Sequence, residues 1–130
     1  MSWLNSDKAM YLYIGLAGFI GANLRFIISE FTYSGDSFFP TGTLICNYIG
    51  CLALGWFSER MKIINMSIKM KTAISTGLIG SFTTFSAFSV ETISLIKNDQ
   101  ILLSFSYILL SLIGGVLLAW FGYKLGSAVK

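Results

Sequence analysis

The sequence lacks histidine altogether and has few charged residues. Lys and Arg together number 9 and Asp and Glu 6 in 130 residues, and no two carboxylates are spaced for acid–base chemistry. Without histidine, without a cysteine outside an apolar segment and without a carboxylate pair, the chain lacks the groups that enzymes use for proton transfer or nucleophilic attack. We therefore expect that the protein is not an enzyme.

Cysteine is also scarce. Cys46 and Cys51 lie in one apolar segment at a spacing that puts them on different faces of a helix. A disulfide has no reason to form there, and a zinc site would need ligands that the chain does not offer. We predict that both thiols simply pack against neighbouring helices.

Apolar residues, by contrast, are abundant. Hydrophobic residues make up 55% of the chain and charged residues 12%, with a mean hydropathy of +0.73, which is outside the range of an ordinary soluble domain. Alternation of period two is absent, so helices rather than barrel strands are expected to span the membrane. We predict an all-α membrane protein of one domain, residues 1–130, in the plasma membrane, with a retained first helix rather than a cleaved signal peptide. The four predicted transmembrane helices cover residues 11–28, 42–57, 72–96 and 101–125.

The basic residues outside these segments are concentrated on one side. Most of them belong to the loop between the second and third segments and to the two termini, namely Arg60, Lys62, Lys69, Lys71, Lys8, Lys124 and Lys130. Lys97 is the main basic residue of the opposite side. This asymmetry predicts cytoplasmic termini for a chain inserted alone, with the basic residues among lipid headgroups. No interleaved basic and aromatic pattern indicates a nucleic-acid partner.

Two charges fall inside the predicted helices. Arg25 follows a row of glycines at 15, 18 and 21 that would let another helix approach closely. It either extends to the headgroups or pairs inside the protein. Glu91, late in the third segment, has the same two alternatives, and neither charge identifies a function.

The third segment is polar for a membrane helix. Gly80–Ser89 contains five hydroxyl residues and three phenylalanines, and we predict a helix break at Gly80 or at the Thr83–Thr84 pair. Broken helices at membrane depth present carbonyls to cations and amides to anions. Phe82, Phe85 and Phe88 recur every third residue and are expected to share a face, for packing or for lining a site.

Polar residues also mark the second and fourth segments. Asn47 lies among apolar neighbours, where its amide either bonds another helix or donates to a small anion. Pro40 and the threonines after it are typical of a helix N-terminus. In the fourth segment Ser104, Tyr107 and Ser111 form one polar stripe that could line a narrow track.

Three sequence motifs resemble those of a known family. Gly18–Arg25, then Gly42–Leu44 with Asn47 and Gly50, then Gly80–Phe88 with Glu91 resemble the Fluc (CrcB) fluoride channels in order and spacing. The resemblance covers nearly the whole chain, and the Thr-Thr-Phe-Ser phrase of the third segment is its most specific part.

The resemblance implies a homodimer of inverted subunits that exports cytoplasmic fluoride passively through two pores, around a central structural sodium ion. The carbonyls of Gly80 and Thr83 would hold the sodium, and Arg25 and Glu91 would be the charged residues of the vestibule. The pore lining carried over from the family comprises Asn47, Phe85, Phe88, Thr84, Ser86, Thr43, Tyr107 and Ser111. Gly115 and Ala119 depart from the hydroxyl-rich pattern of the fourth helix, which leaves the length of the polar track open.

Elementary physics agrees with this assignment. Phenylalanine edges are electropositive and can meet an anion, and hydroxyl and amide donors can replace the hydration shell of fluoride in a narrow pore. Bound sodium in an oxygen cage would add positive potential nearby.

Two alternatives stay open. The one-sided loop charge conflicts with a homodimer inserted in both orientations, so either the bias is too weak to fix the topology or the chain pairs with an oppositely oriented partner subunit, and we favour the homodimer. A proton-coupled drug or cation antiporter subunit is also built from four short helices, although Glu91 is here the only embedded acid and lies late in its segment.

Overall fold

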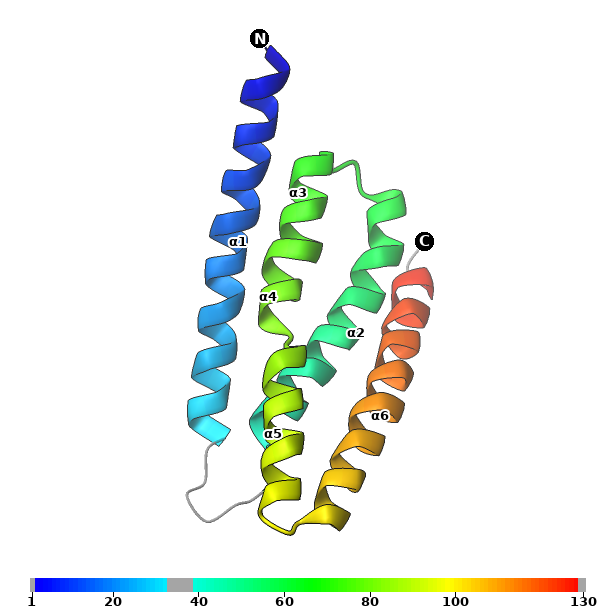
Figure 1. The fold of residues 1–130 in the computed structure, drawn as a ribbon. Helices are drawn as coiled ribbons and strands as arrows, with labels where there is room; N and C mark the ends of the chain where they lie inside the picture. Colours follow the sequence, from blue (N-terminus) through cyan, green and yellow to red (C-terminus); the bar gives the residue numbers. More distant parts are fainter. Residues whose placement is uncertain (1, 33–38, 129–130) are drawn as a thin grey trace.

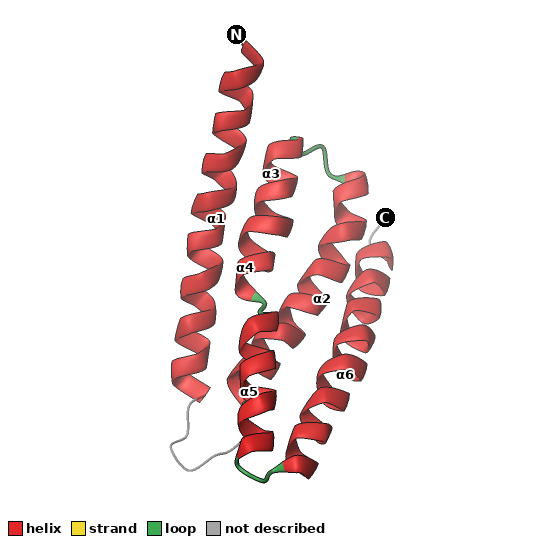
Figure 2. Cartoon of the chain, in the orientation of Figure 1, coloured by secondary structure: helices red, strands yellow, loops and turns green. Residues whose placement is uncertain are grey.

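The computed structural model describes the backbone of residues 2–32 and 39–128, with side chains from residue 8 onwards. All regular structure in these ranges is helical (Figure 2). The elements in chain order are α1 (Ser2–Thr32), α2 (Thr41–Ile63), α3 (Ile68–Thr72), the π-helical η1 (Ala73–Ile79), α4 (Gly80–Phe82), α5 (Phe85–Lys97) and α6 (Ile101–Ala128).

Three helical stretches of the described chain are long and apolar enough to cross a membrane. They are Lys8–Thr32, Ile68–Lys97 and Ile101–Ala128, which correspond to the predicted first, third and fourth helices. The 23 residues of α2 extend about 34 Å at 1.5 Å per residue, but Thr41, Thr43 and Asn47 lower the hydropathy of its first half. The predicted second transmembrane helix therefore stays a prediction.

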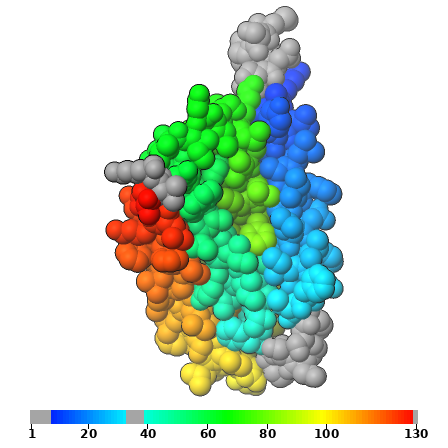
Figure 3. All heavy atoms as spheres, turned by 180° about the vertical axis from the view of Figure 1, so that it is seen from behind, coloured from blue at the N-terminus to red at the C-terminus, as the bar shows by residue number. Residues whose placement is uncertain are grey.

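The helices form one bundle in which α3, η1, α4 and α5 follow one another along a broken line through the middle (Figure 1). α1 packs against η1 and α4 on one side of this line, and α2 packs along α6 on the other. The view from behind shows α2 between α1 and α6 (Figure 3). Both described ends of the chain lie at the same end of the bundle as the α2–α3 connection, whereas the α5–α6 turn lies at the opposite end.

Glycines bring the backbones of neighbouring helices close together. A Cβ atom at Gly21 of α1 would collide with the backbone of Leu78 in η1, and one at Gly55 of α2 would collide with the backbone of Ala119 in α6. Small residues at such positions let membrane helices gain dispersion contacts that larger side chains would prevent. The prediction that the glycines at 15, 18 and 21 let another helix approach closely does not hold for Gly15, because a Cβ atom there would meet no atom within 4 Å.

The chain buries few large side chains and exposes many. Cys46 and Tyr107 are the largest fully buried side chains among the described residues, whereas Phe31 is 87% and Leu102 79% exposed. Both cysteines are free thiols, as predicted. An apolar exterior over a small interior is what lipid or another apolar subunit would surround.

Candidate functional site

The helix break lies at Thr83 and Thr84, between α4 and α5. Thr83 has φ −82° and ψ 158°, and Thr84 has φ −148° and ψ 130°, so both are extended. Gly80 keeps helical angles of φ −64° and ψ −33°. The break is therefore confirmed, and of the two predicted places it occupies the threonine pair, whose branched side chains favour extended backbone.

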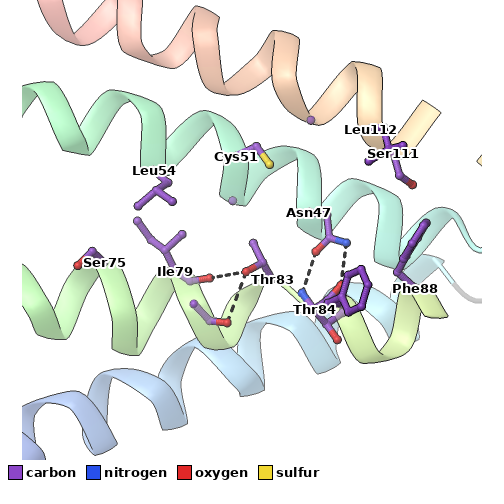
Figure 4. Close-up of a pocket in the computed structure, with 14 residues that line it drawn as sticks. Asn47, Cys51, Leu54, Ser75, Ile79, Thr83, Thr84, Phe88, Ser111 and Leu112 are labelled. Atoms are coloured by element: carbon purple, nitrogen blue, oxygen red, sulfur yellow. Dashed lines mark hydrogen bonds between the residues drawn. The ribbon is translucent and has the colours of Figure 1, made fainter. Parts of the chain in front are cut away.

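Asn47 of α2 bonds both polar groups of the Thr84 backbone. Its Oδ1 accepts from the Thr84 amide at 2.8 Å, and its Nδ2 donates to the Thr84 carbonyl at 3.0 Å (Figure 4). Thr84 in turn begins α5, because its Oγ1 accepts from the Ala87 amide at 3.2 Å. The side-chain amide of Asn47 has two N–H donors, and the Thr84 carbonyl accepts from one of them. The second N–H of Asn47 is therefore left for another acceptor.

This pairing changes the partners of carbonyls at the end of α4. In an unbroken helix the Thr84 amide would donate to the Gly80 carbonyl, but Asn47 takes that amide. The Gly80 carbonyl instead lies 3.4 Å from Thr83 Oγ1, which also donates to Ile79 at 3.1 Å. A carbonyl released from the helix ladder in this way is available to a cation.

Arg25 lies beside the same helix end. Its Nε donates to the Ser81 carbonyl at 3.2 Å, so this side chain turns into the bundle rather than toward the headgroups. A cation at the C-terminal end of a helix is favoured by the helix dipole. No cluster of three His, Cys, Asp or Glu side chains exists in the described part of the chain, so a metal ion at the break would have to use neutral oxygens, which the Gly80 carbonyl can provide.

A pocket of about 350 Å³ opens beside the break. Residues of α2, η1, α4, α5 and α6 line it, with the break at its centre (Figure 4). It brings together seven of the predicted site residues, which are Asn47, Gly80, Thr83, Thr84, Phe85, Phe88 and Ser111. The wall is mainly apolar, so its polar groups are confined to a few places.

Three aromatic rings lie next to one another, two of them in the pocket lining and the third, that of Tyr107, outside it. The ring centroids of Phe85 and Phe88 are 5.8 Å apart, and those of Phe88 and Tyr107 are 5.1 Å apart. Phe85 is 80% exposed, whereas Phe82 is buried. The prediction that the three phenylalanines share one face is wrong, because the break separates Phe82 from the other two.

Glu91 has two hydroxyl partners inside the bundle. Thr43 Oγ1 donates to its Oε1 at 2.6 Å, and Tyr107 OH donates to its Oε2 at 2.7 Å. The three residues join α2, α5 and α6 in a polar cluster that does not line the pocket but touches it through the packing of Phe88 on Tyr107. Sequence reasoning missed this cluster, although an acid in an apolar helix should have prompted a search for donors at the same depth.

The other hydroxyl residues have distinct surroundings. The buried Oγ of Ser111 has no hydrogen-bond partner in the described structure, whereas Ser104 Oγ donates to the Thr92 carbonyl at 3.3 Å. Ser86 lies outside the pocket, with its Oγ 3.1 Å from Thr84 Oγ1. The predicted stripe on the fourth helix therefore divides, and of its members only Ser111 reaches the pocket.

Several pocket residues were not expected from the sequence as site residues. Cys51 and Gly50 of α2 and Ser75 of η1 belong to the lining, as does Gly115 of α6. The glycine at position 115 leaves space without providing a side-chain donor to the pocket. No motif in the sequence indicated Ser75.

Comparison with known proteins gives one consistent result. The profile of the family described as "CrcB-like protein, Camphor Resistance (CrcB)" matches residues 12–123. A protein of Oceanobacillus iheyensis named "Fluoride-specific ion channel FluC" is 45% identical over 122 residues, 92% of each chain. "Fluoride-specific ion channel FluC 2" of Staphylococcus haemolyticus is 41% identical over 90% of this chain and 96% of its own. "Fluoride-specific ion channel FluC 1" of Bacillus cereus is 40% identical over 92% of this chain and 85% of its own.

Proposed function

This chain belongs to the CrcB family, and we propose that it is a fluoride-specific ion channel, as its relatives are named. It is a multi-pass membrane protein, which in a bacterium resides in the plasma membrane. The observation that carries the proposal is the family match over residues 12–123. The pocket at the helix break supports it, because that pocket combines aromatic rings with a few donors. The family assignment bears out the expectation that the protein is not an enzyme, and it counts against the antiporter alternative.

The fluoride path in this proposal passes the pocket beside Asn47. A small and strongly hydrated anion needs donors that replace its water shell. The second N–H of Asn47 and the otherwise unpartnered hydroxyl of Ser111 are suited to that purpose. The edges of Phe85 and Phe88 add weak positive potential without binding the ion tightly, so fluoride moves passively down its electrochemical gradient.

A second subunit would complete the path. One subunit leaves Phe85 80% exposed, and the pocket that it lines is not closed by this chain alone. We propose an antiparallel dimer with two pores along the interface, so that the partner covers this side. The one-sided basic charge keeps two versions open, namely a homodimer of inverted subunits and a heterodimer with an oppositely oriented chain.

A sodium ion would be held at the break by the carbonyls of Gly80 and Thr83. The support is chemical, because Asn47 withdraws the amide that would otherwise bond the Gly80 carbonyl. When bound, sodium supplies positive charge close to the anion path. The protein's own part is to hold the carbonyls out of the helix ladder.

Fluoride efflux from liposomes that contain the purified chain tests the channel. With the membrane potential clamped by a potassium ionophore, we expect fast fluoride efflux and no comparable chloride efflux. The double substitution Phe85→Ile and Phe88→Ile should abolish it, because isoleucine fills space but lacks the electropositive ring edge. A matched control replaces two exposed phenylalanines of α6 outside the pocket, Phe105→Ile and Phe121→Ile, and should retain efflux.

The outcomes separate the channel from its assembly. Efflux from the chain alone supports the homodimer, whereas efflux only after co-reconstitution with an oppositely oriented relative supports the heterodimer. If both double variants lose fluoride efflux equally, the aromatic path is contradicted. The efflux of the unsubstituted chain would still show that it is a channel. Chloride efflux as fast as fluoride efflux would contradict the proposed selectivity.

A further inference from the structure

The two ends of the bundle differ in charge. The end that holds the chain termini and the α2–α3 connection, which we call the basic end, has Glu59 as its acidic residue among the described side chains. Its basic residues are Lys8, Arg60, Lys62, Lys69, Lys71 and Lys124. At the opposite end the described charges are Glu30, Lys97 and Asp99. Among the described side chains, the excess positive charge is therefore gathered at one end.

Aromatic residues mark the depth of the basic end in the membrane. Trp120 and Tyr123 of α6 are 58% and 43% exposed, and rings of these types gather at the boundary between acyl chains and headgroups. The Nζ of Lys124 lies 5.6 Å from the ring centroid of Trp120. The Nζ of Lys62 lies 5.7 Å from that of Tyr123. Both ammonium groups thus lie at headgroup level.

The lysines of the basic end differ in how much of their charge is offset. Lys62 forms an ion pair with Glu59, which largely cancels its charge toward an external anion. Lys71 donates to the Met61 carbonyl at 2.6 Å, a neutral partner that fixes the side chain without neutralising it. Lys124 contacts only the face of an aromatic ring in the described structure. Lys124 and Lys71 therefore each combine a neutral partner that holds the side chain with a charge that no carboxylate offsets in the described structure.

We propose that the basic end binds the phosphate of anionic phospholipids in preference to zwitterionic lipids, with Lys124 and Lys71 as its main contacts. The choice of ligand follows from charge complementarity between the lysines and the lipid. A headgroup with net negative charge is the anion that surrounds a membrane protein at this depth. A zwitterionic headgroup carries its own ammonium, which opposes the lysines. This lipid site lies away from the pocket at the break and does not depend on fluoride conduction.

Tryptophan quenching by brominated lipids tests the site directly. The full chain contains Trp3, Trp56 and Trp120, so Trp3→Phe with Trp56→Phe leaves Trp120 as the only reporter. The protein is reconstituted in phosphatidylcholine with an equal mole fraction of either dibrominated phosphatidylglycerol or dibrominated phosphatidylcholine. We expect stronger quenching by the brominated phosphatidylglycerol, with a preference that weakens at high salt.

Substitution of single lysines identifies the contacts. Each of Lys124→Gln and Lys71→Gln should reduce the preference for phosphatidylglycerol by up to about fivefold, the contribution expected of one basic residue near a membrane surface. Lys97→Gln, at the opposite end, is the matched control and should leave the preference unchanged. Circular dichroism and gel filtration of each variant confirm that the helices and the assembly are intact.

Equal quenching by the two brominated lipids would overturn the proposal. So would a preference that survives both lysine substitutions, or one that Lys97→Gln reduces as much as Lys124→Gln. Because the readout is lipid contact rather than transport, these outcomes do not depend on whether the chain conducts fluoride.

Discussion

Replacing Asn47 with alanine should destabilise the chain at the helix break. The substitution removes both hydrogen bonds to Thr84, of 2.8 Å to its amide and 3.0 Å to its carbonyl. Because both bonds connect α2 with the start of α5, their loss frees the extended residues to reorient. The Thr84 amide can then return to the Gly80 carbonyl, which would straighten the break and withdraw that carbonyl from a cation.

The magnitude follows from two part-buried bonds. Interhelical hydrogen bonds in membrane proteins average about 0.6 kcal/mol and reach about 1.7 kcal/mol. A buried group left without a partner costs about 1–3 kcal/mol. The Thr84 amide can partly recover a hydrogen bond to the Gly80 carbonyl, which limits the cost of leaving that amide without Asn47. We therefore expect a total loss of about 2 kcal/mol in the free energy of unfolding. That loss corresponds to about a 30-fold change in the unfolding equilibrium.

The assay is equilibrium unfolding in mixed detergent micelles, followed by tryptophan fluorescence and circular dichroism. Asn23→Ala is the matched control, because Asn23 also lies within a membrane helix but its Nδ2 donates at 2.7 Å to Phe19 of the same helix. We expect this control to lose less than about 0.5 kcal/mol. Fluoride efflux should also fall in Asn47→Ala at temperatures where the protein stays folded. If the two variants unfold alike, the bonds to Thr84 do not hold the break and our reasoning is wrong.

Three further substitutions test the packing of α1 and the role of Ser111. Gly21→Ala should lower the free energy of unfolding by about 1–3 kcal/mol, because the added methyl meets the backbone of η1. Gly15→Ala, with no atom near the new methyl, should instead raise the free energy of unfolding by up to about 1 kcal/mol. Equal effects at the two glycines would contradict the close packing of α1. Ser111→Ala should change the free energy of unfolding by less than about 0.5 kcal/mol, because its hydroxyl has no partner to lose in the described structure. The same substitution should slow fluoride efflux. Unchanged efflux in liposomes would remove Ser111 from the path.

The sequence predicted best those features that depend on local composition. Long apolar runs located the first, third and fourth helices to within a few residues at most ends, and the paired threonines located the break. The partners of polar side chains could not be obtained in this way, because they depend on the relative rotation of helices. The bonds of Asn47 to Thr84 and of Thr43 and Tyr107 to Glu91 join residues 37, 48 and 16 positions apart. The shared face of the phenylalanines was wrong for the same reason, since a break resets the helical phase.

The placement of the two charges within the bundle bears on how an anion could pass it. A bare carboxylate near the path would repel fluoride strongly at low dielectric. Both carboxylate oxygens of Glu91 accept hydroxyl donors, from Thr43 and Tyr107, and the residue lies outside the pocket lining. Arg25 turns its guanidinium to the end of α4 beside the break and is likewise absent from the pocket lining. The hydroxyl bonds thus disperse the negative charge among neutral donors, and the Ser81 carbonyl binds the positive charge, so a chain with both charges in its membrane helices keeps them off the wall of the proposed path.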